Sequence, residues 1–393
     1  MNEAVVVDTV RSPMGRGRPE GALAALHPVD LLAQTITALL SRNRIDPALV
    51  DDVVIGCVSQ AGEQSGNVGR MAWLAAGLPE HVPAVTVERK CGSSQQAVHF
   101  GAAGIAAGEY DAVVVCGVES MSRVPMGANR LGADVHGPSV AARYTPGLVS
   151  QGVAAELVAN RWKLSRTDLD EYSARSHAAA ARAADSGGFA DEIVPVTLPD
   201  GTVVDTDETI RRGTTADRLA GLRTVFDDET ARARFPDLGW AVTAGNSSQI
   251  TDGAAAMLLT SDRFAEKHGL RPRARFRGFA VCGDDPVLML TAPIPATVRL
   301  LNRTGVRIDD IDHYEVNEAF ASVPLAWQAE FDTAPDRLTP RGGAIAFGHP
   351  LGASGIRLTT TMLGALEATG GRLGLQTMCE AGGMANALIL ERI

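Results

Sequence analysis

Residues 85–120 read VTVERKCGSSQQAVHFGAAGIAAGEYDAVVVCGVES, and residues 344–383 read AIAFGHPLGASGIRLTTTMLGALEATGGRLGLQTMCEAGG. The first stretch predicts a strand, a cysteine, a helix, a strand and a second cysteine. The second stretch predicts the same succession, with a histidine in place of the first cysteine. A duplicated βαβ-type domain would place Cys91 and His349 at corresponding strand-to-helix turns. Such turns lie at the carboxyl ends of strands, where open α/β sheets carry their functional sites.

The flanking sequence continues this alternation in both halves of the chain. In the N-terminal half we expect strands at 4–8, 53–58, 85–87 and 112–116, and helices at 28–40, 67–76 and 92–107. In the C-terminal half we expect strands at 275–281, 313–316, 373–379 and 385–391, and helices at 295–303, 319–330 and 355–368. Strands that alternate with helices predict a mostly parallel sheet with helices on both faces.

The length of 393 residues exceeds what one hydrophobic core usually serves, so we expect two core domains or one duplicated domain. Residues from about 120 to 242 have a different texture. They hold loops, charge-rich turns and a polar helical stretch at 167–186. We interpret this segment as an inserted lid or substrate-loop region.

Composition and charge exclude several classes of function. The net charge of −10 argues against a general nucleic-acid-binding surface, and the apolar runs are too short to span a membrane. The five cysteines, Cys57, Cys91, Cys116, Cys282 and Cys379, show no zinc-site spacing, so no metal site is expected. Widely spaced free thiols fit a reducing compartment. The chain shows no secretory, transit or peroxisomal signal, and we therefore expect a cytoplasmic protein.

Cys91 and His349 are the first candidates for chemistry. Cys91 opens a helix, where the positive end of the helix dipole, with Arg89 and Lys90, is expected to lower its pKa toward a reactive thiolate. His349 stands in a glycine-rich loop and is interpreted as the base for that thiol. The alternatives are a small buried cysteine, a structural histidine or a phosphate-binding loop. The loop lacks the Lys-Ser/Thr ending of the phosphate motif.

Other candidates are weaker when each is taken alone. Cys379 ends a strand before a glycine-rich turn, and Cys116 is interpreted as a buried strand residue. Asn317, at a strand-to-helix junction, fits either a helix cap or an amide that points into a site. The segment 243–248, TAGNSS, reads as a polar turn.

Taken together, these motifs resemble the thiolase superfamily over essentially the full chain. The matching segments are Cys91-Gly92-Ser93 before a small-residue helix, 243–246 (TAGN), 317–320 (NEAF), the glycine-rich loop 342–355 around His349, and Cys379 with its glycine turn. Segments at 188–189 and 191–196 also resemble the family. The order and spacing of five separate motifs make this similarity specific.

The resemblance implies an α/β fold of two duplicated α/β/α domains with mixed five-stranded sheets and an inserted loop domain. The boundaries expected from it are 1–268, with the loop domain at about 120–242, and 269–393. It also implies a homodimer or homotetramer. Coenzyme A is expected as a substrate, and no permanently bound cofactor is expected.

The resemblance further assigns roles to individual residues. Cys91 would attack the keto carbon and carry the acyl group, and His349 would accept the Cys91 proton. Backbone N–H groups of Cys91 and Ala381 would hold the tetrahedral oxyanion. His349 and a water on Asn317 would hold the enolate oxygen, and Cys379 would exchange a proton with its carbon. The residues expected to bind CoA or substrate are Ser248, Arg211, Ala319, Phe320 and Gln151.

The chain also departs from the family pattern. Arg341 replaces the usual Asn before the Gly pair, Ala381 replaces a Gly, and Ser150-Gln151 stands where short-chain biosynthetic members carry His-Met. The segment 223–241 looks longer than in compact members. The changes at Ser150 and Gln151 favour thiolytic cleavage of 3-ketoacyl-CoA over the alternative, condensation of two acetyl-CoA. Two further alternatives are a decarboxylating ketoacyl synthase, against which Cys379 argues, and a non-catalytic acyl-CoA- or lipid-binding protein.

Overall fold

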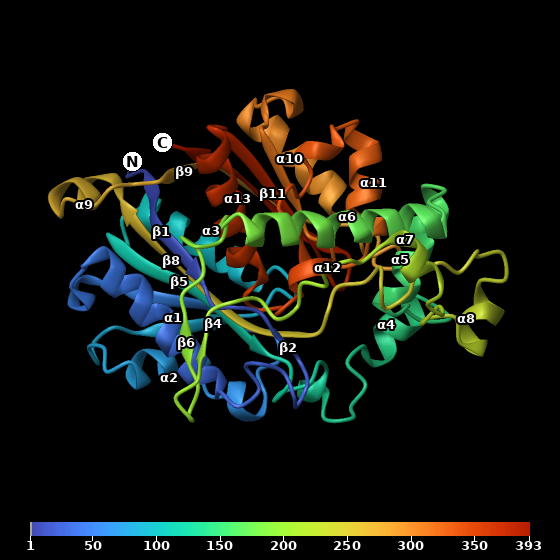
Figure 1. The fold of residues 1–393 in the computed structure, drawn as a ribbon, viewed down its shortest axis with the longest axis horizontal. Coiled ribbons are helices and arrows are strands. Elements are labelled where there is room, and N and C mark those ends of the chain that lie inside the picture. Colours follow the sequence, from blue (N-terminus) through green and yellow to red (C-terminus); the bar gives the residue numbers. More distant parts are fainter. Residues whose placement is uncertain (1) are drawn as a thin grey trace.

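The computed structural model describes residues 2–393 and is built around one ten-stranded sheet (Figure 1). The order along the sheet is β10-β11-β12-β9-β1-β8-β5-β3-β4, and β2 pairs with β8. The strands are β1 (Ala4–Arg11), β2 (Gly15–Arg16), β3 (Asp52–Gly56), β4 (Ala84–Val87), β5 (Ala112–Ser120), β8 (Thr251–Ser261), β9 (Ala274–Gly283), β10 (His313–Val316), β11 (Leu373–Glu380) and β12 (Met384–Arg392).

The two halves of this sheet repeat one topology. In the N-terminal half β4, β3 and β5 are parallel, and β8 and β1 follow antiparallel. In the C-terminal half β10 and β11 are parallel, and β12 and β9 follow antiparallel. The place of β4 is taken by a single parallel bridge from Tyr314 to Leu338, so this half has four named strands. The halves join through β1 and β9, where Val5 pairs with Arg275 and Val6 with Ala274.

The expectation of a mostly parallel sheet is therefore wrong, and the sheet is mixed. No strand is expected from the sequence at 251–261, yet β8 lies there and pairs antiparallel with both β1 and β5. The hairpin from β11 to β12 adds another antiparallel pair. Short connections such as this hairpin permit antiparallel pairing, whereas parallel neighbours need a crossover.

Helices cover the sheet in layers. The helices α3 (Ser93–Ala107) and α13 (Ser354–Thr369) pack against each other and against strands of both halves. The helices α1 (Pro28–Asn43) and α2 (Val68–Ala75) cover the N-terminal half, and α10 (Pro293–Thr304) and α11 (Ser322–Phe331) belong to the C-terminal half. The helices α3 and α13 approach each other closely at Gly355. A Cβ there would lie 2.3 Å from the backbone nitrogen of Gln95.

The chain between β5 and β8 forms the loop region. Its elements are α4 (Gly137–Arg143), α5 (Gln151–Arg161), α6 (Arg166–Asp185), β6 (Val196–Thr197), β7 (Val203–Val204), α7 (Ala216–Ala220) and α8 (Glu229–Arg234). In Figure 1, α6 runs between the two halves, and α4, α5, α7 and α8 gather at one end of the molecule. Arg341 ties this region to α13 by donating to the carbonyl oxygens of Gly188 and Gly364 at 2.7 and 3.0 Å.

The remaining helices are α9 (Asp262–Lys267) and α12 (Ala344–Phe347). Within residues 2–393, no helix combines the length and the apolar composition that a membrane crossing requires.

Candidate active site

The candidate thiols, imidazole and amide come from four separate segments, and two pairs of them lie near each other: Asn317 with His349, and Cys91 with Cys379. Cys91 lies between β4 and α3, Asn317 follows β10, His349 lies between α12 and α13, and Cys379 is near the end of β11. All four side chains are buried. The Asn317 amide nitrogen lies 3.4 Å from Nε2 of His349. Cys91 packs in one small hydrophobic cluster with Leu351, which lies two residues after His349, and with Met378, which precedes Cys379.

The turn that carries Cys91 is tightly constrained. Lys90 adopts a positive φ of 46°, a conformation that costs energy for a residue with a side chain. The Ser93 hydroxyl holds the turn, because it accepts from the Arg89 N–H at 2.9 Å and donates to the Lys90 carbonyl at 2.6 Å. Gly92 leaves no room for a side chain unless Glu380 moves. A Cβ there would lie only 2.0 Å from a carboxylate oxygen of Glu380.

The expectation of a lowered Cys91 pKa is wrong for this structure. Burial, together with the nearby Glu380, raises the pKa of the Cys91 thiol to about 12. Lys90 and a backbone hydrogen bond act in the opposite direction but do not compensate. Desolvation disfavours the charged form more strongly than the helix terminus favours it. Cys91 is therefore a neutral thiol at neutral pH and needs a base to become nucleophilic.

His349 is held as a neutral base by its hydrogen bonds. Its Nδ1 lies 2.6 Å from the Ser354 hydroxyl, which itself donates to the Pro350 carbonyl at 2.9 Å. Since the single hydroxyl proton is used there, Nδ1 must carry the ring proton, and Nε2 keeps its lone pair. Burial lowers the pKa of His349 to about 3, and Arg357 acts in the same direction. The unprotonated Nε2 faces Asn317.

The backbone around His349 fixes the ring in place. The His349 N–H donates to the Gln249 carbonyl and to the Thr251 hydroxyl, both at 3.0 Å. Gly348 has φ +87°, and a Cβ there would lie 1.8 Å from the Thr251 hydroxyl. Only glycine fits this position, because it combines the left-handed conformation with a very close approach.

Asn317 is oriented by the sheet and offers one unused group. Its N–H donates to the Thr377 carbonyl at 3.1 Å, which continues the pairing of β10 with β11. Its side-chain oxygen is buried and has no partner among the described residues. A buried polar atom of this kind normally has a partner, so it is available to a water or a substrate group. Asn317 is therefore not a helix cap, since α11 begins five residues later.

Cys379 lies beside Cys91, and a turn follows it. Burial raises the pKa of the Cys379 thiol well above its ordinary value, and the neighbouring Cys91 and Glu380 add to this effect. The turn places Gly382 and Gly383 at φ 93° and 75°, whereas Ala381 is not among the positive-φ residues. An alanine is thus tolerated at 381, and its N–H remains available. Cys116 is fully buried on β5, paired with Ile55 and Ala256.

Three residues expected to bind the acyl-CoA arm, Ser248, Ala319 and Phe320, lie side by side. The Ser248 N–H donates to the Ala319 carbonyl at 2.9 Å, and Ser247 bridges to Phe320. Phe226, from the lengthened segment, meets the Phe320 ring edge-on at 6.0 Å. The Phe226 ring also covers Gly152, the neighbour of Gln151, because a Cβ there would lie 2.1 Å from it. Phe226 was not expected from the sequence, because only tertiary contact distinguishes it from other loop aromatics.

Arg211 lines a pocket of about 270 Å³ at the edge of the loop region. Two further arginines, Arg212 and Arg218, share this lining with Ser247. Burial lowers the pKa of the Arg211 guanidinium, and Arg16 and Arg18 lower it further, which shows that cations are crowded here. Such a cluster attracts an anionic ligand even though the protein as a whole is acidic. Ser248 itself is not in the lining.

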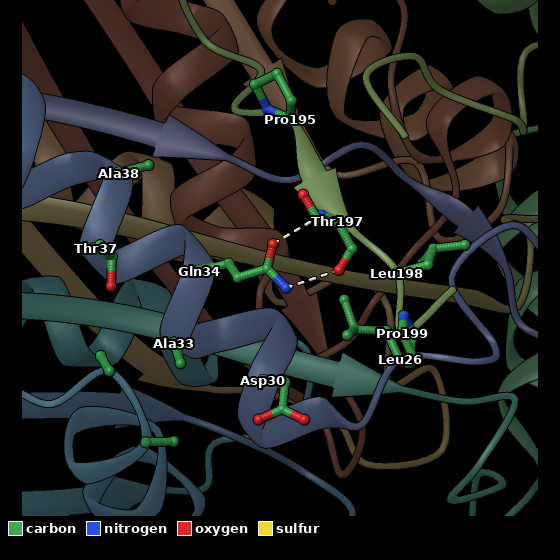
Figure 2. Close-up of a pocket in the computed structure, with 12 residues that line it drawn as sticks. Leu26, Asp30, Ala33, Gln34, Thr37, Ala38, Pro195, Thr197, Leu198 and Pro199 are labelled. Atoms are coloured by element: carbon green, nitrogen blue, oxygen red, sulfur yellow. Dashed lines mark hydrogen bonds between the residues drawn. The ribbon is translucent and has the colours of Figure 1, made fainter. Parts of the chain in front are cut away.

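A larger, more open pocket of about 620 Å³ lies elsewhere, between α1 and residues 195–199 (Figure 2). Gln34 spans it by exchanging two hydrogen bonds with the backbone of Thr197. None of the candidate site residues lines it. Within the described chain, no group of three or more His, Cys, Asp or Glu residues could hold a metal ion.

The fold is a duplicated α/β arrangement, and Cys91, Asn317, His349 and Cys379 are all buried in it. The model of the thiolase N-terminal domain matches residues 4–263, and that of the thiolase C-terminal domain matches residues 270–392. The chain belongs to the thiolase family and is an acyltransferase.

Individual relatives agree with this assignment. The chain is 47% identical over 401 residues to the steroid 3-ketoacyl-CoA thiolase FadA6 of Mycobacterium tuberculosis, with 100% of this chain and 95% of that protein covered. It is 43% identical over 410 residues to the beta-ketoadipyl-CoA thiolase of Pseudomonas aeruginosa, covering 100% and 99%. The crystal structure of the Bacillus anthracis acetyl-CoA acetyltransferase superposes with a TM-score of 0.89 at 34% identity, covering 100% and 99%.

Proposed function

We propose that this protein cleaves 3-ketoacyl-CoA with free CoA, giving acetyl-CoA and a shortened acyl-CoA through a Cys91 acyl-enzyme. The observation that carries the proposal is the neutral His349 ring, whose Nε2 lone pair faces Asn317 at 3.4 Å in the site that holds both thiols. A buried neutral thiol needs such a base at the moment of attack. Relatives named 3-ketoacyl-CoA thiolase support the substrate class.

The reaction divides into two steps. In the first, the Cys91 sulfur bonds to the keto carbon while its proton passes to His349, and backbone N–H groups of Cys91 and Ala381 bind the oxyanion. The carbon–carbon bond then breaks, the Cys379 thiol protonates the acetyl-CoA carbanion, and Cys91 remains acylated. In the second, the Cys379 thiolate takes the proton of the CoA thiol, and the CoA sulfur attacks the thioester to form the shortened acyl-CoA. His349 returns its proton to the released Cys91 sulfur. Splitting one difficult step into two lowers each barrier.

Asn317 and His349 act on the enolate oxygen of the leaving acetyl-CoA. The unpartnered Asn317 side-chain oxygen supports a bound water at this point. Groups positioned in advance of the charge that develops are usually the largest single source of catalysis. Because the site is buried, these interactions are stronger than they would be in water.

The arginine-lined pocket is the proposed entrance for CoA. Arg211 and its neighbours would meet the phosphates, and Ser248, Ala319 and Phe320 would line the pantetheine arm. Gln151 and the Phe226 ring would border the acyl group. CoA acts here as a substrate.

A second candidate function is the condensation of two acetyl-CoA molecules, which the similarity to an acetyl-CoA acetyltransferase structure favours. The identity to that structure is lower than the identity to the steroid 3-ketoacyl-CoA thiolase. A panel of acetoacetyl-CoA and of longer or ring-bearing 3-ketoacyl-CoA substrates separates the two functions. Faster thiolysis of the larger substrates is the expected result.

We further propose a cytoplasmic homodimer or homotetramer, with an N-terminal domain at 1–268 and a C-terminal domain at 269–393. Residues at about 120–242 would form a loop domain inserted in the first.

Mass measurement of the acylated protein tests the proposed function. Incubation with a 3-ketoacyl-CoA should add one acyl group to the wild type and to the Cys116→Ala control, but none to Cys91→Ala. Cys379→Ala should still be acylated by a simple acyl-CoA yet should not catalyse carbon–carbon bond cleavage. Equal acylation defects in Cys91→Ala and Cys379→Ala would contradict the assignment of the two thiols.

A further inference from the structure

Glu380 is a buried carboxyl group that neither reaction step uses. It ends β11 and directly follows Cys379, and its side chain is fully buried. Both of its carboxyl oxygens lack a hydrogen-bond partner among the described residues. Burying an ionised carboxylate without a partner is expensive, so a group in this position favours its neutral acid form.

The carboxyl group lies against the nucleophile's own backbone. Gly92 follows Cys91, and a Cβ at Gly92 would lie 2.0 Å from Oε1 of Glu380 and 2.8 Å from its carboxyl carbon. The same position would lie 2.8 Å from the Asn386 amide nitrogen, which donates to the Gly92 carbonyl at 3.1 Å. Asn386 therefore binds the peptide and leaves the carboxyl group without a donor.

We propose that Glu380 is a positioning residue that controls when the two thiols can carry negative charge, because its carboxyl group, packed on Gly92 and adjacent to Cys379, must be protonated for either thiol to ionise readily. Two negative charges in close proximity and out of water repel each other strongly. The inference rests on the proposed function, in which Cys91 and Cys379 are the reacting thiols.

The charged groups around Glu380 do not cancel the repulsion between its carboxylate and a thiolate at Cys91 or Cys379. Arg89, on the connection before Cys91, favours the carboxylate, and Glu88 on the same connection disfavours it. Burial has the largest effect and raises the pKa of Glu380 to about 8. In turn, Glu380 raises the pKa of Cys91, of Cys379 and of Cys282 on β9. The carboxyl group therefore changes charge near neutral pH while it packs against Gly92, next to Cys91, and follows Cys379 in β11.

Alkylation of Cys91 by iodoacetamide measures thiolate content without requiring turnover. The rate would be followed from pH 6 to 10 on the intact enzyme, with the modified peptide identified by mass. In the wild type, the logarithm of the rate should rise with pH and flatten near pH 8, where Glu380 ionises. In Glu380→Gln the line should stay straight. It should coincide with the wild-type line below pH 8 and lie above it at higher pH, where alkylation is about tenfold faster.

The matched control is Glu88→Gln, which removes a carboxylate that is exposed and paired with Lys90 at 3.1 Å. Its line should remain close to that of the wild type, because solvent screens the charge. Superimposable lines for Glu380→Gln and wild type, or slower alkylation in Glu380→Gln, would overturn the proposal. If Glu380→Gln does not fold, an unbroken line through pH 8 in the wild type would overturn it. None of these outcomes depends on whether Cys91 forms an acyl-enzyme.

Discussion

The Ser354 hydroxyl lies 2.6 Å from Nδ1 of His349 and donates its own proton to the Pro350 carbonyl. This arrangement decides which ring nitrogen is the base. The proton is fixed on Nδ1, so the Nε2 lone pair remains on the side of Asn317. A residue in the first turn of α13 thus determines the chemistry of a side chain five positions earlier.

Ser354→Ala should lower kcat by about 10–100-fold with little change in KM, because the ring would then divide between two tautomers. Steady-state kinetics with a 3-ketoacyl-CoA and CoA measure this effect. Ser173→Ala is the matched control. The Ser173 hydroxyl is also buried and also donates four residues back, to the Leu169 carbonyl at 2.7 Å, but it makes no hydrogen bond to a histidine ring. Equal losses in both variants would show that the effect is structural.

Asn317→Ala should reduce kcat by about 10²–10³-fold, since it removes the group expected to hold the water that donates to the enolate oxygen. Acylation of Cys91 by a simple acyl-CoA, followed by mass, should be affected much less because that step forms no enolate. The two measurements together separate a role in carbon–carbon bond chemistry from a general loss of the site. An equally large acylation defect would argue against the assignment of Asn317 to the enolate.

Gly348→Ala should destabilise the protein by about 3 kcal/mol, because left-handed strain adds to a clash with the Thr251 hydroxyl. Gly370→Ala is the control. Gly370 has φ +72° and no atom within 4 Å of a Cβ, so only the strain of about 1 kcal/mol applies. Urea unfolding measures both free energies. Equal destabilisation would show that the approach of Thr251 to residue 348 is not a tight constraint.

The pH dependence of stability should report the buried Glu380 carboxyl group. Burial raises the folded-state pKa of Glu380 from 4.5 to about 8. Between these values the folded state binds the proton more tightly than the unfolded state. The contribution of this group to the free energy of unfolding therefore falls as pH rises through that window. Relative to Glu380→Gln, the wild type should lose stability from pH 5 to pH 8, by an amount on the order of 1.4 kcal/mol per unit of effective shift. Thermal unfolding of both proteins across this range gives the difference. A constant difference would contradict a raised pKa.

Much of the fold follows from local sequence pattern. The strand at His313–Val316 has the bounds expected from the sequence, and α1, α3 and α13 lie within a few residues of their expected positions. The central strand β8 was not predicted, because an alanine-rich apolar run fits a buried strand and a buried helix equally well. The antiparallel pairing in the N-terminal half depends on that strand and could not be read from alternation alone.

The sequence by itself determined the candidate residues Cys91, Asn317, His349 and Cys379, because each belongs to a short motif whose spacing is a local property. Only the tertiary structure decided their protonation. Burial reversed the expected shift of the Cys91 pKa. Ser354 fixed the His349 tautomer, and the Glu380 carboxyl group packs against Gly92. The physical reason is that desolvation and charge coupling depend on atoms brought together from distant parts of the chain, and residue order does not encode those distances.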